Sequence, residues 1–372
     1  MGHPLIRFEL YQMEQMENTA CLSLALNGGF AARSFTVGGD PFIGNYAFYN
    51  VLFDYYREQQ AAKDWLFDVE DASATITIPL QRGGLEEALT HMAGFLAAQD
   101  FSEDGFSAAK ETAKERFSQQ YKSELFRAGL KLRESTSFNA GFLLSDLLAD
   151  IEQIDFETFV SCAEHLLIPG NMCFCAFGDL GEPDPQALSD ALEKAFPTDE
   201  RTVELRGIAF DPYCRQNCHV MNIGRNRLNL MAEIFSFLES SATCFAKQLV
   251  MSFLAERLPD RDAELVVTPL DSAVVFQADA LQSYSEYLTI PDAEIFASCK
   301  ASLLKKYMSF MSKTPERFCA FCAQSMLLDV YLDQFIQFLD GCTFEQFCEI
   351  CSKADYLVTE AQVVIVKGGR RL

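Results

Sequence analysis

Apolar and polar positions alternate along some parts of the chain and recur at helical spacing along others. Residues 19–26, TACLSLAL, form a short apolar run that ends in an Asn-Gly-Gly turn, and residues 71–80, DASATITIPL, alternate Thr with Ala and Ile. Both patterns predict strands. Residues 44–60 and 85–98 carry apolar side chains at helical spacing, and they predict helices that follow these strands in turn.

Helical spacing continues through the middle of the chain. It predicts helices over residues 103–131, 140–149 and 155–167. The apolar run NMCFCAF at 171–177 is typical of a buried strand. It is followed by GEPDP at 181–185, which is typical of a turn or of the start of a linker.

An internal repeat divides the chain. The segment IDFETFVSCAEHLLIPGNMCFCAFGDL, which starts at Ile154, recurs as CTFEQFCEICSKADYLVTEAQVVIVKGG, which starts at Cys342. Each copy is a helical pattern followed by an apolar strand and a glycine, and each closes a unit of about 180 residues. We therefore expect two related domains in tandem, at residues 1–184 and 206–372, joined by a linker at 185–205.

The composition is that of an ordered globular chain with a surplus of acid. Apolar residues make up 49% of the 372 positions, and 53 acidic residues against 30 basic ones give a formal charge of −23. Binding to nucleic acid or to an anionic membrane needs clustered Lys and Arg, which the sequence lacks, so neither is expected as a partner. The surplus would suit a basic peptide, although an acidic solvated surface is its more common meaning.

The sequence carries no obvious targeting signal. No run of about 18 apolar residues occurs, and the first residues, MGHPLIRFELYQ, lack the basic-then-apolar layout of a signal peptide. The cysteines number 13 and are spread over the whole chain, which suits reduced thiols better than a disulfide framework. We therefore expect a cytoplasmic protein.

Two C-x-x-C pairs and four histidines are further candidates for metal binding or catalysis. The pairs Cys319/Cys322 and Cys348/Cys351 lie in apolar helical patterns, so burial on helix faces is favoured, with metal binding left open. Cys162, three residues from a histidine, would allow a thiolate pair, but a core cysteine is the simpler interpretation. The histidines, His3, His91, His165 and His219, are too scattered for a local metal site. The sequence also contains no nucleophile elbow, Walker or Rossmann pattern.

The stretch at 38–53, GGDPFIGNYAFYNVLF, resembles the first helix of the insulinase, pitrilysin and mitochondrial processing peptidase family. That family carries an inverted zinc motif, H-x-x-E-H, within a segment of the form G-x-A-H-F-L-E-H-M-L-F. Gly44 matches the leading glycine and Phe48 the apolar residue after the first histidine. Phe53 matches one of the closing apolar residues, whereas Asp54 departs from the next.

The residues that perform this family's chemistry are missing. Two histidines four apart hold zinc, and the glutamate between them removes a proton from the metal-bound water. Ala47 and Val51 stand at the histidine positions and Asn50 at that of the glutamate, so neither metal ligands nor a base remain. The third ligand, a glutamate on a later helix, matches Glu111 or Glu115, but one carboxylate does not make a zinc site.

The resemblance also implies a fold class. This is an α+β fold with two tandem homologous domains, each a mainly antiparallel sheet with helices packed on one face. In the second domain it implies paired helices over 232–258 and strands over 265–276. Some two-subunit members hold substrate with an arginine and a tyrosine of this domain. Arg257 lies near the arginine's position, whereas residues 262–265 contain no tyrosine, and a solvated helix end is the alternative for Arg257.

The resemblance further implies a function, that of a non-catalytic subunit in a heteromeric zinc peptidase. Its partner would be a homologous catalytic subunit, and zinc would be bound by that partner alone. Its ligand would be an extended peptide, such as the leader of a modified peptide. The peptide would add as a strand to the sheet edge near WLFDV, with Trp65, Phe67, Val69 and Arg257 as its binding residues.

Two alternatives stay open. The first is a scaffold protein that forms an oligomer and has no proteolytic role, as the family's members in respiratory complexes imply. The second is an active enzyme with a divergent site. The second is disfavoured because the three substitutions remove metal and base together.

Overall fold

The computed structural model describes most of the chain. The residues it describes are 5–16, 19–30, 32–70, 72–123, 144–196, 199–206, 218–222, 228–236, 249–250, 252–253, 264–267, 271–277, 291–353 and 362–367. The chain divides into two compact units. The first contains Met1–Phe117, Ser145–Arg206 and Met308–Tyr331, and the second contains Ser118–Leu144, Gly207–Tyr307 and Leu332–Leu372.

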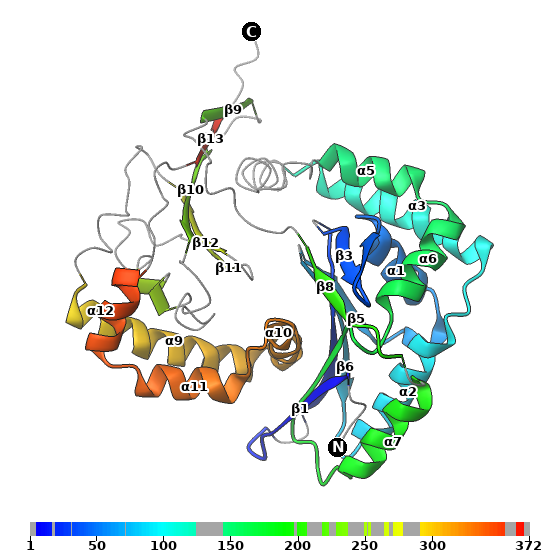
Figure 1. Ribbon diagram of the computed structural model, residues 1–372, viewed down its shortest axis with the longest axis horizontal. Helices are drawn as coiled ribbons and strands as arrows, with labels where there is room; N and C mark the ends of the chain where they lie inside the picture. Colours follow the sequence, from blue (N-terminus) through cyan, green and yellow to red (C-terminus); the bar gives the residue numbers. More distant parts are fainter. Residues whose placement is uncertain are drawn as a thin grey trace. The chain divides into compact units, whose positions relative to one another are not determined.

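A five-stranded sheet forms the core of the first unit (Figure 1). Its strands in spatial order are β1 (Arg7–Gln12), β7 (Met172–Gly178), β2 (Ala20–Asn27), β6 (Ser73–Leu80) and β5 (Leu66–Val69). β1 pairs with β7 in parallel, and the remaining neighbours are antiparallel. All of β7 and nearly all of β2 is buried, as expected for strands covered on both faces.

Helices cover one face of this sheet (Figure 1). They are α1 (Phe48–Arg57), the 3-10 helix η1 (Gln60–Ala62), α2 (Leu85–Ala98), α3 (Glu103–Gln120), α5 (Leu144–Gln153), α6 (Phe156–Leu166) and α7 (Pro185–Ala195). Two of them start at side-chain caps: the carboxylate of Asp155 accepts the Thr158 N–H at 2.7 Å, and that of Asp184 accepts the Gln186 N–H at 2.9 Å. A helix is present in each of the five predicted intervals of this half. α2 has the predicted bounds, α1 and α6 are shorter, and α5 ends later than predicted, at Gln153.

Aromatic rings join these helices. Phe159 of α6 is fully buried, and its ring centroid lies 5.7 Å from that of Phe48 in α1 and 5.1 Å from that of Phe106 in α3. It also meets Phe101 edge to face at 5.0 Å. Each such pair adds to the burial of apolar area, so Phe159 fixes how α1, α3 and α6 pack.

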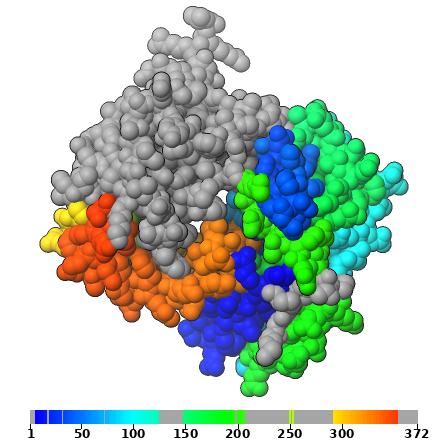
Figure 2. Space-filling model, viewed as in Figure 1, coloured from blue at the N-terminus to red at the C-terminus, as the bar shows by residue number. Residues whose placement is uncertain are grey.

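The opposite face of the first sheet is covered by α10 (Pro315–Met326), which comes from late in the chain. The Phe318 ring packs on Phe177 of β7 at 5.1 Å, and the Cys319 Sγ donates to the backbone oxygen of Cys175 at 3.2 Å. Arg7 of β1 pairs with Asp329 at 2.7 Å, and Figure 2 shows this orange segment against the dark blue N-terminal strand. Residues 308–331, predicted as part of the second domain, thus belong to the first unit.

The interval 185–205, predicted as a linker, also belongs to the first unit. α7 packs on α2 through its apolar face, which includes the buried Leu188 and Leu192. β8 (Val203–Leu205) joins β3 (Ser34–Val37) and β4 (Asp40–Ile43) in a small sheet of order β4-β3-β8. The Pro and Asp residues around 182–185 end the loop and cap α7, so the turn prediction there was right while its extension into a linker was not.

The second unit repeats the sheet of the first. Its strands in spatial order are β9 (Cys218–Asn222), β13 (Gln362–Lys367), β10 (Leu228–Ser236), β12 (Asp271–Gln277) and β11 (Glu264–Val267). β13 pairs with β9 in parallel and with β10 in antiparallel, as β7 does with β1 and β2. Phe156 and Phe344, matched in the sequence repeat, start α6 and α12 (Phe344–Lys353). The predicted α+β fold with two tandem homologous domains is confirmed.

One prediction for the second unit was wrong at its start. Residues 232–258 were expected to form paired helices, yet Ala232 to Ser236 end β10 and pair with β12. Residues 249–250 and 252–253 are helical, and the rest of this interval lies outside the described residues. The segment LNLMAEIFS pairs with β12 on one side and with β13 on the other, so sheet pairing overrides its helix-forming residues. The strands expected over 265–276 are present as β11 and β12.

Three further helices complete the described part of the second half: α9 (Ala293–Lys313), α11 (Leu332–Gly341) and α12. In the second unit, the Phe296 ring of α9 lies 4.9 Å from that of Phe347 in α12. α9 is 21 residues long but carries several charged side chains. Among the described helices none is long and apolar enough to cross a membrane.

A substitution at Gly178, at the end of β7, tests whether the close approach of β7 to the start of β2 stabilises the first sheet. The φ of Gly178 is +113°, and an added Cβ would lie 2.1 Å from the backbone oxygen of Thr19. We expect Gly178→Ala to lower the free energy of unfolding by about 2–4 kcal/mol, because strain and overlap add. Gly94→Ala, on an exposed turn of α2 with open space around it, should instead raise it by up to about 1 kcal/mol. Urea unfolding of both variants checks this, and equal effects would contradict it.

Candidate functional site

Helix α1 carries the stretch that resembles a zinc helix. It starts at Phe48 rather than at residue 44, because Asn45 Oδ1 accepts the Ala47 N–H at 2.8 Å and Asp150 Oδ2 accepts the Tyr46 N–H at 2.9 Å. These bonds satisfy backbone donors ahead of the first turn. Nearly every side chain of α1 is buried, so the helix crosses the interior of the first unit.

The three positions that would hold the family's zinc machinery are buried and inert. Ala47 caps α1 and Val51 lies one turn further on, both fully buried. Asn50 is 2% exposed, and its Oδ1 accepts from the Arg116 guanidinium at 3.4 Å. An alanine, a valine and an amide that already faces a cation offer neither a ligand set nor a base.

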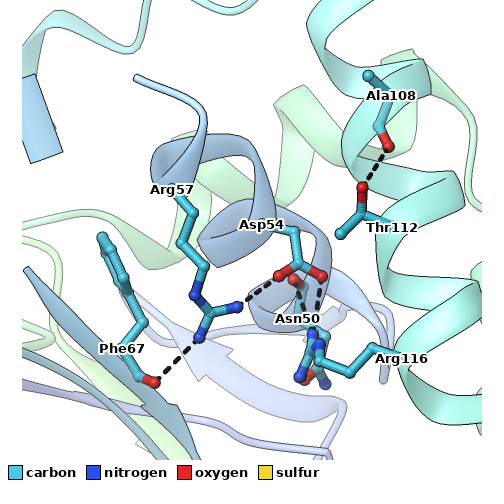
Figure 3. Close-up of polar contacts among 7 residues, drawn as sticks. All are labelled: Asn50, Asp54, Arg57, Phe67, Ala108, Thr112 and Arg116. Atoms are coloured by element: carbon cyan, nitrogen blue, oxygen red, sulfur yellow. Dashed lines mark hydrogen bonds and ion pairs between the residues drawn. The ribbon is translucent and has the colours of Figure 1, made fainter. Parts of the chain in front are cut away.

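A polar network occupies this place instead (Figure 3). Asp54, 2% exposed in α1, accepts from Arg116 of α3, whose Nη2 lies 2.9 Å from its Oδ2. Its other oxygen accepts from Arg57, one turn further along α1. The second Nη of Arg57 donates to the backbone oxygen of Phe67 in β5 at 3.0 Å. Two guanidiniums therefore neutralise one buried carboxylate, and one of them extends the network to the sheet edge.

The third-ligand candidates do not complete a metal site. Glu111 and Glu115 are both exposed on α3, whereas Arg116 of the same helix reaches α1. A cation at that position would repel a divalent metal ion. Across the described residues, no group of three or more His, Cys, Asp or Glu side chains is placed to hold a metal.

Sequence reasoning missed both arginines of the network. It noted that Asp54 departs from the family's apolar pattern but gave the departure no partner. A lone carboxylate in an otherwise apolar helix, with Arg57 three residues later, was the available signal, because buried charges are paired. Nothing local pointed to Arg116, which is 62 residues from Asp54 in sequence and meets it only through tertiary packing.

β5 is the outer strand of the first sheet, where the sequence predicts peptide binding. Trp65, just before β5, is 7% exposed and packs edge to face on Phe95 at 5.1 Å. Its N–H donates to Ala62, so its backbone is engaged in a turn. Phe67 packs on Phe53 of α1 at 5.1 Å. Trp65 thus anchors the strand, while Phe67 and Val69 lie within it and remain predicted binding residues.

The hydrogen-bond pattern fixes which groups of β5 point away from the sheet. Glu70 N donates to Ser73 O at 2.8 Å, so these two residues form a hydrogen-bonded antiparallel pair. Such pairs alternate with non-bonded ones, and Phe67 lies opposite Ile76 at a non-bonded position. The N–H and C=O of Phe67 therefore face the open edge.

The hydrogen bonds between β6 and β2 also indicate that the backbone groups of Phe67 face outward. Gly28 N donates to Ala72 O at 2.9 Å, and Leu24 lies opposite Ile76 in the same register. Ile76 therefore directs its backbone groups to β2 and none to Phe67. Val69, two residues along from Phe67, also faces outward. Within the described residues, no strand pairs with β5 on this outer side.

Buried hydroxyls near α1 offer no base. The Tyr49 hydroxyl donates to Asn27 O at 2.8 Å and accepts from Asn171 Nδ2 at 3.3 Å. Burial raises the pKa of the Tyr49 and Tyr56 hydroxyls well above their usual value. Both therefore stay protonated at neutral pH and hold the core around α1.

The remaining candidates from the sequence belong to the core. Cys319 and Cys322 are buried on α10 against the sheet, as expected, and burial raises the pKa of the facing Cys175 thiol. Cys351 is buried on α12, with Cys348 partly so. Burial also raises the pKa of Cys162 to about 12, so this thiol does not form a thiolate.

The two histidines whose side chains the structure describes, His91 and His165, likewise have structural surroundings, whereas His3 lies outside the described residues. His165 stacks on Phe42 with ring centroids 4.3 Å apart, and its Nδ1 lies 2.7 Å from Ser161 O. His91 is exposed and meets the edge of Trp65. Arg257, the predicted substrate-binding residue of the second domain, lies outside the described residues.

The whole fold matches solved peptidase structures. An M16-like peptidase from Alicyclobacillus acidocaldarius is 12% identical with a TM-score of 0.76, covering 97% of this chain and 96% of that one. An M16 peptidase inactive domain from Pseudomonas fluorescens is 14% identical with a TM-score of 0.71, covering 100% and 97%. A chain of complex III2 from Candida albicans is 9% identical with a TM-score of 0.70, covering 97% and 93%. No family model and no curated protein sequence matches the chain.

The chain thus has the fold of M16-like peptidases over nearly its full length. At such low identity the likeness defines the fold alone. What the chain does has to be argued from the residues at α1 and β5.

Asp54 should be the most sensitive residue of the site. We expect Asp54→Ala to lower the free energy of unfolding by about 2–3 kcal/mol, because Arg57 and Arg116 both lose the carboxylate that they share. Asp64→Ala, at an exposed position near the end of the same segment, should change it by less than about 0.5 kcal/mol. Urea unfolding measures both, and similar midpoints for the two variants would contradict a structural role for the network.

Proposed function

We propose that this chain is a non-catalytic peptidase-fold subunit that binds an extended peptide along the outer edge of β5. The observation that carries the proposal is the network of Asp54, Arg57 and Arg116. It fills the place of the zinc machinery with cations and leads from there to the open strand. A cation pair disfavours a metal ion at this place, while no described strand pairs with the outer edge of β5, where Arg57 covers the Phe67 carbonyl.

Peptide binding at this edge would depend little on sequence. The outward N–H and C=O groups of Phe67 and Val69 supply main-chain hydrogen bonds to an added strand. The exposed Leu66 lies on the strand's other face and offers apolar area to a peptide side chain. A leader segment of a modified peptide is the ligand proposed here, because an added strand needs only an extended main chain.

The proposed partner is a homologous catalytic chain with an intact inverted zinc motif. The inactive M16 domain among the solved structures supports a subunit of this kind, since it pairs the fold with lost catalysis. Zinc belongs to the partner in this proposal, and both chains act in the cytoplasm. Neither nucleic acid nor a membrane takes part, in keeping with the formal charge of −23.

A second candidate function is that of a scaffold subunit without any proteolytic role. The likeness to a chain of complex III2 favours it, because this fold also occurs in an assembly of another kind. It differs from the first proposal in one measurable respect. A scaffold forms its oligomer without regard to a peptidase and leaves proteolysis unchanged.

Mixing the chain with a homologous peptidase that carries an intact inverted zinc motif, taken from the same genome, separates the two functions. We expect the chain alone to contain no stoichiometric zinc and to cleave no peptide. With the peptidase it should form a heterodimer by light scattering and raise the rate of leader cleavage. A self-contained oligomer that leaves cleavage unchanged would support the scaffold function, and zinc bound by the chain alone would contradict both.

A proline in β5 tests the strand edge directly. Val69→Pro removes one outward N–H and leaves the β5–β6 bonds in place. We expect it to weaken binding of a fluorescent nonapeptide of alternating Thr and Val by about three- to tenfold, the worth of one hydrogen bond. Val69→Thr keeps the N–H and should bind as the native chain does. Equal anisotropy titrations for the proline and threonine variants would place the peptide elsewhere.

A further inference from the structure

The outer carbonyl of Phe67 is already covered. Arg57 Nη2 donates to it at 3.0 Å, while the other Nη of Arg57 holds Asp54. The guanidinium carbon also lies over the Phe67 ring, 5.4 Å from its centroid. An added strand needs this carbonyl as an acceptor, so Arg57 has to give up that bond when a peptide binds.

The network around Arg57 has more donors than acceptors. One carboxylate, Asp54, serves two guanidiniums, which leaves a local surplus of one positive charge. Arg116 Nε and Asn50 Nδ2 are buried and have no hydrogen-bond partner among the described residues. A further acceptor at the edge of β5 would therefore meet Arg57, the one guanidinium of this network that reaches Phe67.

We propose that Arg57 selects an acidic side chain in a peptide strand added to β5. This inference rests on the proposed peptide binding at that edge. The peptide residue opposite Phe67 lies on the same face of the sheet as the Phe67 side chain, and this is the face of α1. When the peptide N–H takes over the Phe67 carbonyl, the freed donor of Arg57 meets a carboxylate at that residue.

Charge favours this choice over a neutral or basic side chain. Asp54 holds Arg57 at the edge through its other Nη, so the guanidinium remains close when it releases Phe67. Asp68 is exposed and points to the opposite face of the strand, so it does not compete. The formal charge of −23 would by itself draw a basic peptide, so a preference for an acidic one has to arise locally.

Three fluorescein-labelled peptides test the proposal, Thr-Val-Thr-Val-Xaa-Val-Thr-Val-Thr with Glu, Gln or Lys at the centre. Anisotropy titrations with the full chain should show the Glu peptide binding about three- to tenfold more tightly than the Gln peptide. Arg57→Gln should bind the Glu and Gln peptides equally. Arg57→Lys keeps the positive charge but lacks the two separate Nη donors of the guanidinium, so it should retain part of the preference for Glu.

Arg82→Gln is the matched control, because Arg82 is a half-exposed cation paired with Asp179 away from β5. It should keep the full preference for Glu, and unfolding midpoints confirm that each variant is folded. Equal binding of the three peptides by the native chain would overturn selection by Arg57 while leaving peptide binding at the edge intact. A preference for Lys that survives in Arg57→Gln would also overturn it. No binding of any peptide would overturn the proposed function together with the inference.

Discussion

A carboxylate in an apolar helix has to be neutralised, and the surroundings of α1 follow from this requirement. Asp54 is almost fully buried, so its charge would be costly without close cations. Arg57 comes from the next turn of the same helix, and Arg116 comes from α3. Pairing with Arg116 ties α3 to α1, and pairing with Arg57 holds a guanidinium at the edge of the sheet.

The same requirement explains how α1 is held in place with Ala47, Asn50 and Val51 at the positions that resemble a zinc motif. A zinc helix presents its ligands to an ion that supplies two positive charges. Here Arg57 and Arg116 supply two positive charges from the chain itself, against a single carboxylate. The helix therefore keeps its place against the sheet, with Ala47 and Val51 as ordinary core residues.

Much of the fold could be predicted from the sequence, because its strongest signals are local. The run at 171–177 is continuously apolar, and the helices at 85–98 and 155–167 have apolar residues at clear helical spacing. The similarity of the segments that start at Ile154 and Cys342 indicated the tandem domains. The errors came where distant partners decide. β10 is a strand because β12 and β13 pair with it. The interval predicted as a linker contains α7, which packs on α2, and β8, which pairs with β3.

The sequence indicates which catalytic residues the candidate site lacks, but it does not indicate which residues contact one another there. The losses at Ala47, Asn50 and Val51 can be read from a motif, since each stands at a fixed spacing. The gain of Arg116 cannot, because it depends on which turn of α3 faces α1. The outward direction of Phe67 likewise depends on the register of the β5–β6 hairpin, which one residue of slip would reverse.

The position of α10 has a consequence for how the chain is made. The first sheet is complete in sequence when β7 ends at Gly178, but the helix that covers its second face begins only at Pro315. During synthesis the face that includes Cys175 and Phe177 stays uncovered while the intervening residues emerge. The second face of the first sheet can therefore be covered only after Pro315–Met326 has left the ribosome, so the first unit folds completely only when a segment far downstream of β7 has been made.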